Sequence, residues 1–281
     1  MHLYIDRIPA DRSRRVNRRG FFQRLIAFAG GCGLAHRELG AAGSTSAPSP
    51  GPPQELGVTA LPVNYPGAGA TLEGYLSRPQ ANGPSPGVIV IHQSAGLNDP
   101  IRTVARRLAA EGFAALAVDL LSRQGGTTSF ATAAEVTRAV GTLAEGQIIP
   151  DLDATFRYLQ SHSFVRPERI GVLGFLWGGH QAILYAAVNP ALKAVVVFCG
   201  GAPPDVKLQQ IQCPVLANYG ENDAHRSEVE RLMKKYGKTL DVAMYPGAAD
   251  AVCSDASPHY NEAVTQEAWA RTLGFLRKNL S

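Results

Sequence analysis

The chain has 281 residues, enough for one large α/β domain with extra segments, and 45% of them are hydrophobic, as in ordinary globular proteins. Its net charge of +4 comes from the first 40 residues, where eight arginines face three acidic residues; the remainder holds 19 basic and 20 acidic residues. This near-neutral remainder argues against a nucleic-acid-binding protein, and no run of about 18 apolar residues predicts a membrane-spanning helix in the folded part.

The first 40 residues have the pattern of an export signal. Arg18-Arg19 precede Gly20-Phe21-Phe22, and an apolar stretch follows at 25–34, which resembles a bacterial twin-arginine signal. The alternative is a basic, disordered N-terminal arm. Residues rich in Ala, Gly, Ser and Pro follow and are typical of a linker. We therefore expect a signal region at 1–40, a linker at 41–56 and one domain at 57–281, located in the periplasm or secreted.

The rest of the chain alternates between predicted strands and helices. Apolar runs such as 88–91 are typical of strands buried on both faces. The predicted strands are 57–64, 70–78, 88–92, 113–120, 170–174, 194–198, 215–219 and 242–245. The predicted helices are 101–111, 131–144, 148–161, 180–188, 227–236 and 260–280. This alternation predicts an α/β fold whose mostly parallel sheet is covered by helices on both faces.

The stretch from Gly171 to Gly179 stands at the centre of this pattern. An apolar run meets a glycine-flanked corner, and a helical stretch follows, which is the outline of a nucleophile elbow. Glycines suit an elbow because its residues crowd one another and its central residue is strained. That central residue should be Ser, Cys or Asp, but here it is Leu176, which cannot attack a carbonyl carbon.

Together with three further stretches, this elbow carries a resemblance to the dienelactone hydrolase family of α/β-hydrolases over roughly residues 57–280. The matching stretches are 92–120, 174–179, 219–223 and 245–248. The resemblance implies an α/β-hydrolase fold and the hydrolysis of esters and lactones. It also implies a Cys nucleophile, a His base, an Asp, and a Glu near the oxyanion hole that helps to control the thiol.

Only one of these four side chains is present when the family motif is carried onto this sequence. Asp223 matches the family Asp, whose role is to orient the catalytic His. Leu176 occupies the nucleophile position, Asp250 the His position and Gln93 the Glu position. The oxyanion donors are backbone amides, which do not depend on the side chains. The resemblance assigns them to Trp177 and Ser94.

Three hypotheses follow from these substitutions. The first is an exported dienelactone-hydrolase-like protein whose hydrolytic machinery is lost or crippled, and whose cleft keeps a small ester-like or lactone-like ligand. The second is an active hydrolase or lyase-like enzyme that uses Asp223 and Asp250, since one of two neighbouring carboxylates would hold a proton; the alternative places Asp250 in solvent. The third is that the substitutions were engineered on an active parent.

Other reactive residues have simpler interpretations. We expect His92 to be a hydrogen-bonded framework residue, His180 to face packing, and His225 and His259 to lie on surface loops; the alternative is that His225 or His259 approaches the cleft. Ser94 is an unsuitable nucleophile if its amide is an oxyanion donor. No cluster has metal-ligand spacing and no phosphate-binding glycine motif follows a strand, so we expect no metal and no cofactor. We expect a monomer with no nucleic-acid partner and no stable membrane insertion after signal removal.

Three cysteines remain after the leader. An odd number does not indicate a disulfide framework. We expect Cys199 and Cys213 to be small buried side chains rather than reactive thiols. Cys253, three residues after Asp250, would be a displaced thiol, but no histidine is suitably placed to activate it.

Overall fold

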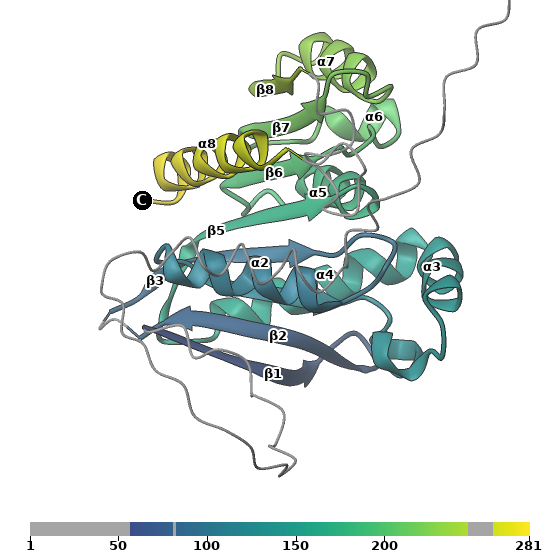
Figure 1. Ribbon diagram of the computed structural model, residues 1–281, viewed down its shortest axis with the longest axis vertical. Helices are drawn as coiled ribbons and strands as arrows, with labels where there is room; N and C mark the ends of the chain where they lie inside the picture. Colours follow the sequence, from purple (N-terminus) through teal and green to yellow (C-terminus); the bar gives the residue numbers. More distant parts are fainter. Residues whose placement is uncertain (1–56, 81–82, 247–260) are drawn as a thin grey trace, which may run out of the picture. The chain divides into compact units, whose positions relative to one another are not determined.

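The computed structural model describes residues 57–80, 83–246 and 261–281 (Figure 1). All of them belong to the second of two compact units, Pro52–Ser281. Asp250, Cys253 and His259 lie outside the described residues, as does the twin-arginine stretch.

Eight strands form one sheet in the order β1-β2-β4-β3-β5-β6-β7-β8 (Figure 1). β1 pairs antiparallel with β2, and β2 with β4, while every later pair is parallel. The carboxyl ends of β3 to β8 therefore meet at one edge of the sheet, where ligands bind in open α/β sheets. The strands are Val58–Pro66, Thr71–Pro79, Ser85–Ile91, Ala114–Asp119, Val165–Phe175, Ala194–Phe198, Val215–Gly220 and Leu240–Tyr245.

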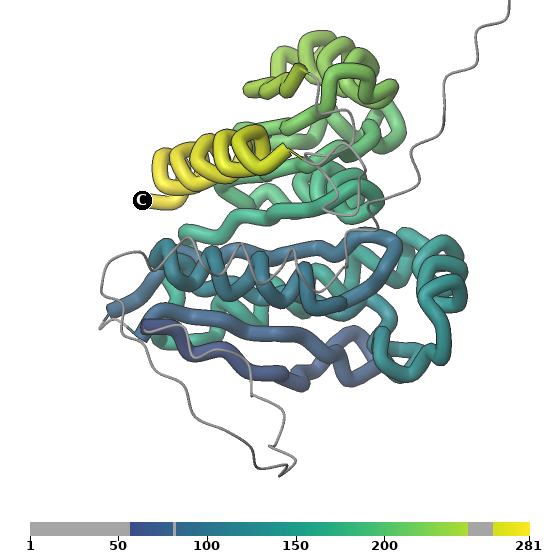
Figure 2. Tube along the Cα trace, in the orientation of Figure 1, coloured from purple at the N-terminus to yellow at the C-terminus, as the bar shows by residue number. Residues whose placement is uncertain are grey.

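Helices cover both faces of this sheet, as Figures 1 and 2 show. α2 (Asp99–Ala110) and α8 (Glu262–Leu280) contribute to the apolar core on one face. The other face is covered by α4 (Glu145–Gln160), α5 (Trp177–Val188), α6 (Asp205–Leu208) and α7 (Arg226–Lys235). α3 (Ala133–Gly141) packs through Val136 and Val140 in a small cluster of its own.

The central strands supply both cores because successive side chains point to opposite faces. On β3, Ile89 and Ile91 join the core under α4 and α5, whereas Val88 and Val90 join the core under α2 and α8. All four side chains are fully buried. This explains why β3 reads as a continuous apolar run, and it confirms the predicted α/β class with its mostly parallel, doubly covered sheet.

Element boundaries differ from the predicted ones where the sequence signal is weak. β5 begins at Val165, five residues before the predicted start, because the polar stretch Arg166–Arg169 hid its first half. α6 has four residues, too few for a helical period, and was not predicted. α5 begins at Trp177 rather than at residue 180, so the helix follows the elbow directly.

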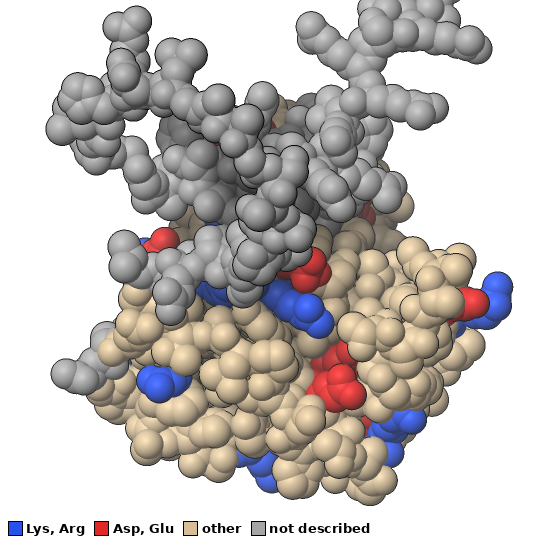
Figure 3. Space-filling view, turned by 60° about the horizontal axis from the view of Figure 1, so that its bottom comes forward, with Lys and Arg blue, Asp and Glu red and all other residues tan. Residues whose placement is uncertain are grey.

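Charged side chains of both signs lie on the described surface. On the face in Figure 3, which looks toward the β1–β2 end, blue and red side chains are scattered among uncharged ones. Many pair across elements: Lys235 with Asp205, Arg271 with Asp241, and Arg277 with Glu111. Among the described helices, none is both long and apolar enough to span a bilayer.

Candidate functional site

The turn between β5 and α5 has the geometry of a nucleophile elbow. Leu176 has φ 52° and ψ −113°, one of two non-glycine residues in the described chain with positive φ. Such a conformation costs about 1–3 kcal/mol for a residue with a Cβ and persists only where the surroundings impose it. The Leu176 amide donates to the Phe198 carbonyl on β6 at 2.7 Å, which anchors the turn. The predicted elbow is therefore present, with a leucine at its tip.

Glycines allow the elbow to close. A Cβ on Gly174 would lie 2.1 Å from the Gly178 carbonyl oxygen, so strand and helix meet with no room for a side chain. A Cβ on Gly178 would lie 2.3 Å from the carbonyl oxygen of His92, at the end of β3. In both places backbone atoms occupy the space that a Cβ would need, and the side chain at position 176 is not among the atoms in contact. The fold holds this turn whether or not a nucleophile stands on it.

A cavity of about 260 Å³ opens beside the elbow at the carboxyl edge of the sheet. Leu176 and Trp177 form an apolar wall, and Asp223 comes from the loop after β7. The structure thus brings together three of the residues predicted from the family motif. The full lining is Leu176, Trp177, His180, Cys199, Gly201, Asp223 and His225.

Two histidines also line this cavity; His225 was expected near the cleft only as an alternative, and His180 was not expected there. His180 lies on the first turns of α5, where we expected it to face packing, and its Nδ1 is 3.2 Å from the Gly201 carbonyl oxygen. His225 is exposed, as a surface loop residue should be, yet its ring packs against Gly201. Its backbone amide donates to Asp223 Oδ1 at 2.8 Å. The loops after β6 and β7 take part in these contacts, and neither loop has a periodic pattern that predicts them.

Burial lowers the pKa of His180 below its ordinary value, and the nearby His225 lowers it further. The carbonyl groups of Gly201 and Ala202 and the charge of Glu145 act in the opposite direction without reversing the shift. His180 is therefore mainly neutral at pH 7. Because a carbonyl oxygen can only accept, Nδ1 carries the proton and Nε2 is the acceptor in the neutral ring.

The remaining predicted site residues either do not line the cavity or lie outside the described chain. Gln93 and Ser94 are partly exposed on the loop after β3, and neither lines the cavity. The Gln93 carbonyl oxygen accepts from His92 Nδ1 at 2.7 Å and from the Gly96 amide at 3.1 Å. Asp250, at the His position, is not described, so its predicted proximity to Asp223 stays a prediction.

His92 is a framework residue, as predicted. It is fully buried, its Nδ1 donates to the Gln93 carbonyl, and its Nε2 accepts from the Leu120 amide at 3.2 Å. Burial is the main reason that its pKa is lowered, and the Gln93 carbonyl and Asp119 only oppose the shift. Its ring stacks on Trp177 with centroids 5.8 Å apart. His92 thus connects the ends of β3 and β4 to the cavity wall.

A second network fixes the loop that follows β3. The Asp119 carboxylate accepts from the amide and hydroxyl of Thr127 at 2.7 and 2.9 Å, and Thr127 Oγ1 accepts from the Leu97 amide at 2.9 Å. Gly96 has φ 69°, and a Cβ there would lie 2.4 Å from that hydroxyl. The loop bearing Ser94 is therefore held in one conformation.

Cys199 and Cys213 are both buried, as predicted. Cys199 is buried and lines the cavity, but it is disulfide-bonded. Cys213 is buried and free. The bonded state of Cys199 was not predicted, because an odd count of cysteines only argues against a framework of several disulfides.

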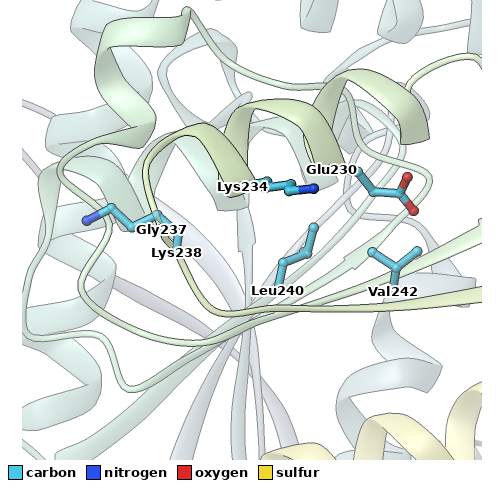
Figure 4. A pocket seen from close by; sticks show the side chains of 6 residues that line it. All are labelled: Glu230, Lys234, Gly237, Lys238, Leu240 and Val242. Carbon is cyan, nitrogen blue, oxygen red and sulfur yellow. The ribbon is translucent and has the colours of Figure 1, made fainter.

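Other parts of the described chain offer no competing site. No group of three or more His, Cys, Asp or Glu side chains within 57–80, 83–246 and 261–281 is arranged to hold a metal ion. A larger hollow of about 510 Å³ lies between α7 and β8, with Glu230 and Lys234 on the helix and Leu240 and Val242 on the strand (Figure 4). It is an open surface hollow at the sheet edge, away from the elbow, and holds none of the predicted site residues.

Comparisons with known proteins agree with this fold. A candidate carboxymethylenebutenolidase from Methylorubrum extorquens is 31% identical over 239 residues, covering 79% of this chain and 82% of its own. A candidate 2-oxo-3-(5-oxofuran-2-ylidene)propanoate lactonase from Bradyrhizobium is 33% identical over 222 residues, covering 73% and 89%. The crystal structure of a candidate dienelactone hydrolase from Klebsiella pneumoniae superposes with a TM-score of 0.71 at 31% identity, covering 79% of this chain and 99% of that one.

The profile of the dienelactone hydrolase family matches residues 72–280, which is most of the chain. The match spans the sheet from β2 onward, the elbow and the loop that carries Asp223. With its eight-stranded α/β-hydrolase sheet and its strained elbow, the chain belongs to the dienelactone hydrolase family.

Proposed function

We propose that this protein is a member of the ester and lactone hydrolase class whose hydrolytic activity is lost or severely impaired, and that its cleft binds a small ester-like or lactone-like molecule. The observation that carries the proposal is Leu176 at the tip of an intact elbow. Covalent acyl transfer needs a nucleophile, a base that activates it and a group that orients the base. An alkyl side chain at the point of attack removes the first requirement.

The other substitutions agree with this loss. Asp250 replaces the imidazole base that the family resemblance implies, and Gln93 replaces the carboxylate beside the thiol. A carboxylate that controls a thiol has no role once the thiol is absent. Asp223 alone remains, and in the described structure its Oδ1 accepts a backbone amide. Backbone oxyanion donors can still leave roughly 10³–10⁴-fold catalysis over water after triad removal, so weak turnover is compatible with the proposal.

The test compares the purified protein with a variant carrying Gln93→Glu, Leu176→Cys and Asp250→His, using p-nitrophenyl acetate and a dienelactone. We expect the native protein to stay near the background rate. The restored variant should exceed it by at least about a hundredfold, because an oriented base contributes about 10²–10⁴ in rate. Adding Asp223→Asn to the restored variant is the matched control and should remove most of the gain.

Two other outcomes would contradict the proposal. Equal turnover by the native and restored forms would place a nucleophile elsewhere and remove the significance of Leu176. Turnover by the native form that Asp250→Asn abolishes would instead support a mechanism based on the two carboxylates.

We further propose that the protein is exported. Arg18-Arg19 and the apolar stretch after them support this location, and so does the disulfide at Cys199, since disulfides persist in oxidising compartments. Fusing residues 1–56 to a reporter that is active only in the periplasm tests it. Export should be lost when both arginines become lysines, whereas export of the lysine variant would contradict a twin-arginine route.

A further inference from the structure

The cavity beside the elbow has two chemically different sides. Leu176 and Trp177 present apolar surface, and Trp177 is held in place by stacking on the buried His92. The imidazoles of His180 and His225 and the carboxylate of Asp223 form the polar side. A volume of about 260 Å³ suits a molecule with one small ring or a short chain and one polar group.

His180 determines which polar group fits. Its Nδ1 is committed to the Gly201 carbonyl, so Nε2 is a lone-pair acceptor in the neutral ring. A carboxylate cannot accept from that nitrogen unless a proton is added between them. Once protonated, the ring donates Nε2–H to the anion in a charge-assisted hydrogen bond. The first turn of α5 favours negative charge at the same place.

We propose that the cavity binds a small carboxylic acid as a carboxylate and a proton together, with the proton held at His180. This deepens the proposed function and rests on it, because in an active hydrolase such an acid would be a product that must leave. No covalent bond forms or breaks: one proton moves from solvent to Nε2, and one carboxylate enters.

The groups around His180 are consistent with a proton taken up on binding. Burial and His225 keep the free imidazole neutral, and its pKa is lowered, so at pH 7 the proton must come from solvent. Glu145, on α4, raises the pKa of His180, but its carboxylate is already paired with Lys207. Cys199 is disulfide-bonded and does not titrate. His225 and Asp223 are the remaining described titratable residues that line the cavity, so the test needs a variant at His225.

Isothermal titration calorimetry of the full chain with benzoate, from pH 6.5 to 8.5, tests the proposal. Affinity should fall by about tenfold per pH unit, because the complex holds one more proton than the free partners. Repeating the titration in two buffers with different ionisation enthalpies should show an uptake of about one proton per benzoate. Benzamide, with the same ring and no charge, should bind without this pH dependence.

Two variants at His180 distinguish the contribution of its proton from that of a hydrogen-bond donor that does not titrate. His180→Leu should weaken benzoate binding at pH 6.5 by at least about tenfold, since the charged donor is lost. His180→Gln keeps a donor but cannot titrate, so its benzoate affinity should not change across the range. His225→Asn should keep the slope of the native protein.

Three results would overturn the inference: no benzoate binding at pH 6.5, binding with no pH dependence, or a slope that persists in His180→Gln. Ester turnover by the native protein would contradict the proposed function instead. That turnover is measured separately, so the two failures are distinguishable.

Discussion

The substitution Gly178→Ala tests whether the fold itself imposes the elbow. The new methyl group would lie 2.3 Å from the His92 carbonyl oxygen and 2.6 Å from the Ile91 carbonyl oxygen. Both atoms belong to the backbone at the end of the central strand β3, so no side chain can turn aside to make room. Either β3 or the start of α5 must shift.

Overpacking of this kind costs about 1–3 kcal/mol, and we expect the upper end because only backbone can yield. A loss of 3 kcal/mol lowers the melting temperature of a domain of this size by about 6–12 °C. Gly274→Ala in α8 is the matched control, since no atom lies within 4 Å of the added methyl group. Alanine in a helix interior should raise stability there by about 0.5–1 kcal/mol.

Urea denaturation of both variants and the native protein measures these opposite changes. If Gly178→Ala unfolds at the same urea concentration as the native protein, helix α5 does not lie against β3 as described. In that case the persistence of the strained turn at Leu176 would need another explanation.

Three further substitutions probe the surroundings of the site. Thr127→Val should lower the free energy of unfolding by about 1–3 kcal/mol in urea denaturation, because a backbone amide loses its acceptor; Thr127→Ser should stay close to native. Arg123→Met should lower the free energy of unfolding by about 3 kcal/mol, because the buried Asp151 carboxylate loses the guanidinium that lies 2.7 Å away. Arg123→Lys keeps the charge and should lower it less; equal losses for the two variants would contradict a charge effect. The pKa of His92 is lower in the folded state, so the free energy of unfolding should fall as the pH drops below about 6.5. His92→Gln should make the free energy of unfolding less dependent on pH. An unchanged pH dependence in this variant would show that His92 is not its source.

The fold was predictable because its signals are local and repeated. β3 and β4 are buried on both faces, so their sequences are continuous apolar runs of strand length. The elbow was predictable for a different reason. Its close approaches tolerate only glycine at 174 and 178, and that requirement leaves a fixed spacing in the sequence.

The composition of the cavity could be predicted only in part. Asp223 was found because it follows a recognisable stretch at the end of β7. His180 and His225 were assigned to packing and to the surface, since their presence in the cavity depends on how two loops meet at Gly201. Both imidazole rings contact Gly201 from segments more than twenty residues away in the sequence, and no periodic pattern predicts such contacts.

The strained backbone at Leu176 has a consequence for how this scaffold can change. Positive φ at the tip is usually explained by the reaction that the tip residue performs, yet here an alkyl side chain occupies it. Elbow geometry is thus inherited with the glycines and the β6 hydrogen bond, independently of chemistry. A single codon change could deliver a thiol or hydroxyl to the cavity mouth without moving the main chain. One substitution at position 176 would therefore restore a nucleophilic side chain on an elbow that already has its backbone geometry.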